Sequence, residues 1–324
     1  MSRPRIALIS NPKSTGNLAQ LPRIRAFCSD HPDIFHYEVE SVGQIGEAMR
    51  TIAFIRPSVL AINGGDGTVQ AVLTELCNGG HFGDMAPPVA VLPSGKTNLI
   101  ALDLGAQGDP VESLERLIEI ANADLVPHIV ARELISLSGG EEQSKPVIGM
   151  FLGGAGLADI MLYCRERIYP LGLPNGLSHF ITAVAVVLRN VVGMRASFLP
   201  PEPRPMSVVV RREGAITGRF AFLFVTTLER LLLTSELSSG GKGPLKFVAV
   251  EHRPVSMLRA FAASLVGRLG RTKLAGVHVE EADEIAIEGE ESQVILDGET
   301  FRPGPGKPIL LRPAPPLSFV RIAA

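Results

Sequence analysis

The first 125 residues alternate between short apolar stretches and segments with a helical pattern. The apolar stretches predict strands at residues 5–10, 35–40, 58–62 and 88–92. Between and after them, apolar residues recur at helical spacing and predict helices at 18–28, 44–55, 69–77, 98–104 and 110–121. Strands that alternate with helices indicate parallel pairing through right-handed crossovers. We therefore expect an α/β fold with a doubly wound parallel sheet in this part of the chain.

The pattern changes near residue 129, after which strand-like segments predominate. They predict strands at 129–138, 147–152, 207–212, 221–226, 246–250, 277–280, 284–288 and 293–296. Two helical inserts are expected at 177–191 and 255–269. We predict an α/β domain over 1–127 and a β-rich, sandwich-like domain over 128–324, with a last strand that can return to the first domain.

Composition limits the class of protein. Of 324 residues, 46% are hydrophobic and 20% charged, which suits a folded chain with a sizeable core. The net charge of −2 and the lack of a long basic block argue against a dedicated nucleic-acid binder. Cys28, Cys77 and Cys164 are too scattered for a disulfide framework or a zinc motif, and they fit buried thiols in a reducing cytosol.

No stretch of the sequence predicts export or a membrane span. The N-terminal apolar segment is too short for a signal peptide, and the longest apolar run, at 181–188, is too short to cross a bilayer. We expect a cytoplasmic protein that can contact the inner face of the membrane peripherally. A homodimer is an open alternative to a monomer.

Three predicted strands of the α/β domain end in loops of glycine and small polar residues. The loops span 11–17, 64–68 and 93–98, and each precedes a helix. Parallel strands place such loops at one edge of the sheet, where helix N-termini attract anions and glycine allows close approach of a phosphate. One such loop is as easily an ordinary strand–helix turn, whereas three at one edge favour a phosphate-bearing ligand.

Two charged residues stand among these loops. Asp66 would repel phosphates unless it works with Mg²⁺ or orients an attacking hydroxyl, and its alternative role is that of a turn or N-cap aspartate. Lys96 can reach a phosphate as a point charge, or it can be a solvated surface lysine. The segment around Lys96 is not a Walker A loop, because that motif requires glycine where Ala90 stands.

The three loops resemble the nucleotide loops of the diacylglycerol kinase catalytic-domain family, which includes bacterial lipid kinases and the sphingosine and ceramide kinases. The resemblance rests on Asn11-Pro12 with Ser14 and Gly16, on Gly64-Gly65-Asp66-Gly67-Thr68, and on Pro93, Gly95 and Asn98. Later segments agree in order, namely Gly154-Ala155-Gly156-Leu157, residues 175–180 and Asp297-Gly298-Glu299. The second loop alone is less specific, because NAD kinases share it.

The resemblance implies an ATP- and Mg²⁺-dependent lipid kinase that phosphorylates a hydroxyl of diacylglycerol, a sphingoid base or a ceramide. It implies that Asp66 positions the metal and the hydroxyl and that Glu299 is a candidate general base, although Leu296–Glu299 also reads as a hairpin turn. Individual metal ligands are not assigned. The residues expected to contact the nucleotide are Asn11, Pro12, Ser14, Gly16, Ser41, Gly64, Gly65, Gly67, Thr68, Gly95, Lys96, Thr97 and Asn98.

The chain departs from the family pattern at several acidic positions. Lys96 replaces the usual threonine, Leu99 an aspartate and Ala71 a glutamate. An acidic position after the Gly-Ala-Gly segment falls on Ala158, with Asp159 one place later, and a late Asp-Gly appears as Lys242-Gly243. The positive charge of Lys96 is a candidate to replace part of the effect of a metal cation that the missing acidic residues would have bound. The departures keep two alternatives open: a kinase of a soluble alcohol, similar to NAD kinases, and a catalytically weak protein that binds nucleotide or lipid.

The two helical inserts of the second half carry apolar faces. Residues 177–188 are almost wholly apolar, and 255–269 lie near Arg253, Arg259, Arg268 and Arg271. Such helices suit an anionic membrane surface or an acyl-chain channel. The alternative is that their apolar faces pack against the sheet while the arginines are solvated.

Overall fold

The computed structural model describes residues 5–83, 85–141, 143–168, 201–211, 214–229, 243–289 and 292–323. The predicted helix at 177–191 and the segment at 175–180 lie outside these residues. In the described part, no helix is long and apolar enough to cross a membrane.

The N-terminal part contains four parallel strands in the order β4-β3-β1-β2. The strands are β1 (Ile6–Ser10), β2 (Ile34–Glu38), β3 (Val59–Asn63) and β4 (Val89–Val91). The helices are α1 (Asn17–Asp30), α2 (Ile45–Ile55), α3 (Asp66–Asn78), α4 (Leu99–Asp103) and α5 (Pro110–Asn122), with 3₁₀ turns η1 (Val42–Gln44) and η2 (Val126–His128). The doubly wound α/β prediction is confirmed.

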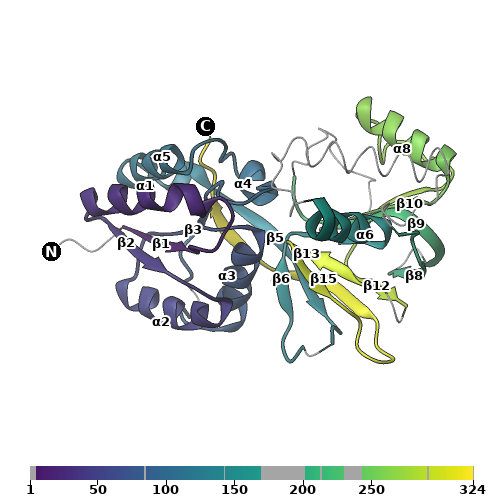
Figure 1. The fold of residues 1–324 in the computed structure, drawn as a ribbon, viewed down its shortest axis with the longest axis horizontal. Helices are drawn as coiled ribbons and strands as arrows, with labels where there is room; N and C mark the ends of the chain where they lie inside the picture. The colour runs from purple at the N-terminus through teal and green to yellow at the C-terminus, as the bar shows by residue number, and fades with distance from the viewer. Residues whose placement is uncertain are drawn as a thin grey trace.

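Helices cover both faces of this sheet, and the sequence shows why. Strands β1 and β3 are buried along their whole length, as expected of strands packed on both sides. In Figure 1, α1 and α5 lie on one side of these strands and α2 and α3 on the other. Helix α2 turns Ile45, Ala48 and Ile52 inward at helical spacing, which fixes its buried face.

The second half is rich in strands, as predicted. The strands are β5 (Ile129–Ser138), β6 (Val147–Gly149), β7 (Phe151–Gly154), β8 (Pro205–Val210), β9 (Gly214–Thr226), β10 (Leu245–Glu251), β11 (Val277–Ala282), β12 (Ile285–Glu288), β13 (Val294–Leu296), β14 (Glu299–Phe301) and β15 (Ile309–Val320). The helical segments are α6 (Ala155–Tyr163), the π-helical turn η3 (Cys164–Ile168) and α8 (Pro254–Leu265).

Strand β9 links two layers of this half. Its first part pairs with β8 and its second part with β10 and β7, all antiparallel. A second hydrophobic core fills the space between the layers, with Leu152, Val225, Phe247 and Leu311 buried in it. This arrangement satisfies the alternating inward-facing pattern of a sandwich.

The last strand, β15, joins the two halves. It pairs parallel with β4 at Phe319 and antiparallel with β5, and beyond it the Ile322 amide donates to the Leu104 carbonyl at 3.0 Å. We expected a last strand that can return to the first domain, but the pattern did not predict a strand at 309–320, because three prolines interrupt it. A register shift between Ala314 and Leu317 accommodates Pro315 and Pro316, whereas Pro313 keeps a position opposite Ile135.

Other differences from the predicted elements are local. The strand expected at 147–152 breaks at Met150 into β6 and β7. Helix α6 begins within the Gly-Ala-Gly segment, which had been interpreted only as a motif. The boundary expected near residue 127 stays a prediction, because β5 and β15 both run along the junction.

Candidate active site

The first and second loops, with the start of the third, meet at the carboxyl ends of β1, β3 and β4. The Ser14 hydroxyl donates to the Ser94 carbonyl at 3.1 Å, and the Asn11 side-chain amide donates to the Thr68 hydroxyl at 2.9 Å. Gly16 lies against the backbone of Ser94, so closely that a Cβ at position 16 would overlap the Ser94 carbonyl. Glycine is therefore required at Gly16 for this contact.

The third loop, 93–98, is shaped by Asn98. Its side-chain oxygen accepts from the Gly95 amide at 2.6 Å. Asn98 itself adopts a φ of 54°, a left-handed conformation that asparagine tolerates better than most residues. A Cβ at Gly95 would lie 3.2 Å from the Cα of Gly65, so the second and third loops are in contact.

Asn17, which the sequence analysis did not single out, connects the first two loops through hydrogen bonds to their backbone. This buried side chain donates to the carbonyls of Asn11 at 2.8 Å and Asn63 at 3.0 Å. It thereby ties the end of β1 to the end of β3. The only sequence signal was an asparagine in the first turn of a helix directly after the loop glycine.

Asp66 occupies the first turn of α3, immediately after the Gly65 N-cap. Its surroundings are poor in water, and this burial raises the pKa of the Asp66 carboxyl to about 6. The side chain lines the cavity described below. At neutral pH most of this carboxyl is ionised, yet its proton affinity is higher than that of an exposed aspartate.

A hairpin from the far end of the chain brings Glu299 to the same place. The turn between β13 and β14 has positive φ at Asp297 (43°) and Gly298 (89°), as an Asp-Gly hairpin turn requires. The Gln70 side chain of α3 donates to the Leu296 carbonyl at 2.7 Å and ties this hairpin to the helix of Asp66. The exposed Glu299 carboxylate consequently lies beside Gly67.

Asp297 anchors this hairpin from inside the protein. Its carboxylate accepts from the amides of Met150 at 2.8 Å and Phe151 at 2.9 Å, at the break between β6 and β7. Burial raises the pKa of Asp297 to about 7; the nearby Asp66 also raises it, whereas the two amide donors oppose the shift.

These elements enclose a cavity of about 610 Å³ with two chemically different sides. One side is polar and includes Ser14, Thr15, Asp66, Lys96, Thr97 and Glu299. The other is apolar and includes Leu99, Phe151, Ile160, Met161, Leu162 and Ile295. Arg165, also unpredicted, lines the cavity and donates to the Gly298 carbonyl at 3.3 Å.

The predicted site residues fall into three groups. The structure brings eight of them to the cavity wall: Ser14, Gly65, Asp66, Gly67, Gly95, Lys96, Thr97 and Glu299. Five others support the loops behind that wall: Asn11, Gly16, Gly64, Thr68 and Asn98. The remaining two residues belong to neither group. Pro12 lies in the first loop, and the exposed Ser41 lies after β2, where its carbonyl accepts from the Gln44 amide.

Residues 5–126, which contain all three loops, match the family model described as the diacylglycerol kinase catalytic domain. This part of the chain is similar to that family. The match ends before the second half of the chain, so Glu299 and α6 lie outside it.

Solved structures extend the similarity to the fold of nearly the whole chain. Three structures from Bacillus anthracis str. Sterne, named as diacylglycerol kinases, two of them provisionally, match with TM-scores of 0.64, 0.66 and 0.62. Each is 16% identical, and the alignment covers 99% of this chain and 98% of the other. At this identity they show the fold alone. No curated protein sequence matches the chain.

The departures noted in the sequence change the surroundings of this cavity. Leu99 and Lys96 line it, so an apolar and a basic side chain stand where the family pattern has an aspartate and a threonine. Asp159 lies on a separate cleft with Arg204, and burial raises the pKa of this carboxyl. Lys242 lies outside the described residues.

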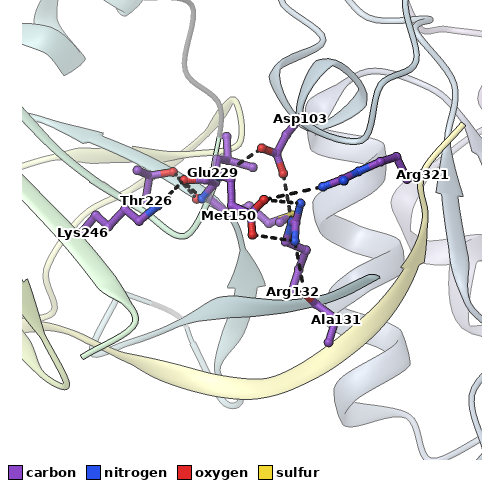
Figure 2. Close-up of polar contacts among 9 residues, drawn as sticks. Asp103, Ala131, Arg132, Met150, Thr226, Glu229, Lys246 and Arg321 are labelled. Atoms are coloured by element: carbon purple, nitrogen blue, oxygen red, sulfur yellow. Dashed lines mark hydrogen bonds and ion pairs between the residues drawn. The ribbon is translucent and has the colours of Figure 1, made fainter. Parts of the chain in front are cut away.

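A partly buried ionic network at the end of α4 was also missed by the sequence analysis (Figure 2). Arg132 of β5 donates to the fully buried Asp103 at 3.1 Å and to both carboxylate oxygens of Glu229 at 2.9 Å. The Glu229 amide in turn donates to Asp103 at 3.0 Å. The network links α4 to the segment that follows β9. Its members are far apart in sequence, so no local sequence pattern predicts the network.

Proposed function

We propose that this protein is a kinase that transfers the γ-phosphoryl group of ATP to the hydroxyl of a lipid alcohol. The observation that supports this most is the lining of the cavity, which combines phosphate-compatible loops, Asp66 and Glu299 with apolar side chains. The family of residues 5–126 supports kinase chemistry. The lipid acceptor, the nucleotide and the roles below are our proposal.

The polar side suits a triphosphate. Backbone amides of the glycine loops and the start of α3 provide donors with a favourable dipole, as at other helix N-termini that bind phosphate. Lys96 and Arg165, which both line the cavity, add positive charge. We assign both to neutralising charge on the nucleotide.

Mg²⁺ fits this donor set only together with the nucleotide. Among the described residues, no group of three or more His, Cys, Asp or Glu is placed to hold a metal by itself. Mg²⁺ usually keeps several waters and binds through one or two carboxylates plus substrate phosphates. Asp66 and Glu299 are the carboxylates in reach, and the bound ion would supply neutralisation of phosphate charge.

The chemistry requires little covalent participation by the protein. The lipid oxygen bonds to the γ-phosphorus while the bond from that phosphorus to the β–γ bridging oxygen breaks, and ADP leaves. The hydroxyl proton passes to a carboxylate. Asp66, with its pKa near 6, can orient the hydroxyl, and the exposed Glu299 is the candidate base.

The apolar side favours a lipid over a soluble acceptor. Ile160, Met161 and Leu162 of α6 face the cavity with Phe151 of β7. A small sugar or a nicotinamide nucleotide would leave this surface without a partner, whereas an acyl or sphingoid chain would cover it. Because such substrates reside in bilayers, we propose that the cytoplasmic enzyme acts at the inner membrane surface.

The test is a labelled-ATP assay across lipid alcohols and soluble alcohols, with products separated by chromatography. We expect label in at least one lipid and none in glycerol or NAD. Label in a soluble alcohol alone would indicate the NAD-kinase-like alternative. Nucleotide binding with no labelled product from any acceptor would indicate a binding protein.

A further inference from the structure

Helix α8 turns an apolar face to the outside of the protein. Leu258 is 68% exposed, Phe261 57% and Leu265 64%, and they recur at helical spacing. Two more exposed residues, Val255 and Val266, extend the same stripe. Figure 1 shows α8 on the periphery of the strand-rich half. Exposed apolar stripes of this kind mark interaction surfaces more often than isolated exposed residues do.

The opposite face of α8 already packs on the protein. Met257, Ala260 and Ala263 lie against a small core that includes Val248 and Val250 of β10. The helix therefore has two apolar faces, and only the inner one is covered within the described chain. No described element packs on the outer stripe.

The charge of the sequence around this stripe is one-sided, although Arg253 forms an ion pair with Glu251 at 3.3 Å. Residues 252–279 contain no aspartate or glutamate, although the whole chain has a net charge of −2. The same stretch carries five cationic residues: Arg253, Arg259, Arg268, Arg271 and Lys273. All five are exposed. An apolar stripe with a cationic border is complementary to an anionic lipid surface, where chains accept the apolar residues and headgroups the charges.

A second copy of the chain fits this surface less well. A two-fold contact through α8 would bring two identical cationic borders together, and like charges at an interface are repulsive. The helix has 12 residues, too few to span a bilayer, so it would lie in the interfacial plane.

We infer that α8 is a docking surface for anionic membranes, formed by Val255, Leu258, Phe261, Leu265 and Val266 with their cationic border. This deepens the proposed function, because docking would bring the enzyme to a bilayer-resident substrate. Its test uses vesicle binding without nucleotide, so the inference and the kinase reaction can fail independently.

The experiment is flotation with phosphatidylcholine vesicles that contain or lack phosphatidylglycerol. We expect the wild-type protein to float only with the anionic vesicles. The double variant Leu258→Ser/Phe261→Ser should bind about tenfold more weakly or worse, and Arg268→Gln/Lys273→Gln should also bind more weakly. High salt should weaken wild-type binding by screening.

A matched control is available on another surface. Phe54 of α2 is 90% exposed and, like the α8 stripe, lies near arginines, namely Arg50 and Arg56. Because Phe54 is a single exposed residue outside the α8 stripe, Phe54→Ser should bind vesicles like the wild type, and all variants should keep the wild-type unfolding temperature. Equal binding with and without phosphatidylglycerol, or full binding by the α8 variant, would overturn the inference. So would α8-dependent self-association in place of vesicle binding.

Discussion

The carboxylate of Glu299 lies against the backbone of Gly67, so that a Cβ on residue 67 would come within 2.5 Å of Glu299 Oε1. Gly67 belongs to the second loop and Glu299 to a hairpin near the end of the chain. The contact places a late carboxylate beside the loop of Asp66. The lack of a side chain at Gly67 thus leaves room for the Glu299 carboxylate, which comes from the other half of the protein.

Substitution of Gly67 by alanine should displace Glu299 while leaving the fold intact. Gly67 lies within a helix and has no positive φ, so alanine fits the backbone there. Because Glu299 is an exposed, flexible side chain, it should move away from the new methyl group. We expect turnover to fall by about tenfold to a hundredfold if Glu299 acts as the base. Steady-state kinetics and thermal unfolding measure the two effects.

Gly218→Ala provides the matched control for this variant. A Cβ at Gly218 would meet Phe220 at an ordinary 3.8 Å, far from the loops in sequence. Its turnover should equal that of the wild type. A Gly67→Ala enzyme with full activity would remove Glu299 from the mechanism.

Lys96 should contribute mainly to nucleotide binding. Its side chain lines the polar side of the cavity, where charge is the property that matters for a phosphate. We expect Lys96→Ala to raise the KM for ATP by about tenfold. Lys307→Ala, an exposed lysine elsewhere, should leave KM unchanged. If KM and turnover of Lys96→Ala both match the wild type, the hypothesis that Lys96 replaces a lost cation is wrong.

The raised pKa values of Asp66 and Asp297 predict how stability depends on pH. Both folded-state values lie above the ordinary aspartate range, near 6 and 7. The stability linked to these groups is therefore fully present at low pH and is lost as pH rises through 6 and 7. Asp66→Asn should abolish its share of that loss.

The expected gain is measurable by chemical denaturation. At pH 8, Asp66→Asn should be about 1–3 kcal/mol more stable than the wild type, and near pH 4 the difference should approach zero. Exposed Asp30→Asn should show no such pH-dependent difference. A variant that is less stable than the wild type at pH 8 would show that the Asp66 carboxylate stabilises the loops.

The sequence predicted which residues form the loops better than it predicted the side chains that hold the loops in place. Glycine, asparagine and aspartate after buried strands carry a local signal, so the loops of Gly16, Gly65 and Gly95 could be recognised. The Asp-Gly turn before Glu299 carried one too. Asn17 and Arg165 carried almost none, because their roles depend on groups distant in sequence.

The misread elements also have physical reasons. Strand β15 contains prolines that its bulge tolerates, and α6 begins with glycines that resemble a loop. The Arg132 network depends on Asp103 and Glu229, which lie on either side of it in the chain. Such contacts follow from tertiary packing and produce no periodic pattern in the sequence.

Removing Arg132 should be strongly destabilising. Its side chain is 6% exposed and that of Asp103 is fully buried, so Arg132→Met leaves a buried carboxylate without its partner. We expect a loss of about 3–5 kcal/mol in the free energy of unfolding. The double variant Arg132→Met/Asp103→Leu should lose less than the sum of the single variants. Additive losses in this double-mutant cycle would show that the two side chains are not coupled.

The most direct test of the central claim is single-turnover phosphoryl transfer by Asp66→Asn, measured beside nucleotide binding. With the lipid that the wild type labels best, we predict transfer at least about a hundredfold slower, while ATP without Mg²⁺ binds as tightly as before or more tightly, because a negative charge is lost near the phosphates. Transfer at the wild-type rate by Asp66→Asn would contradict the account.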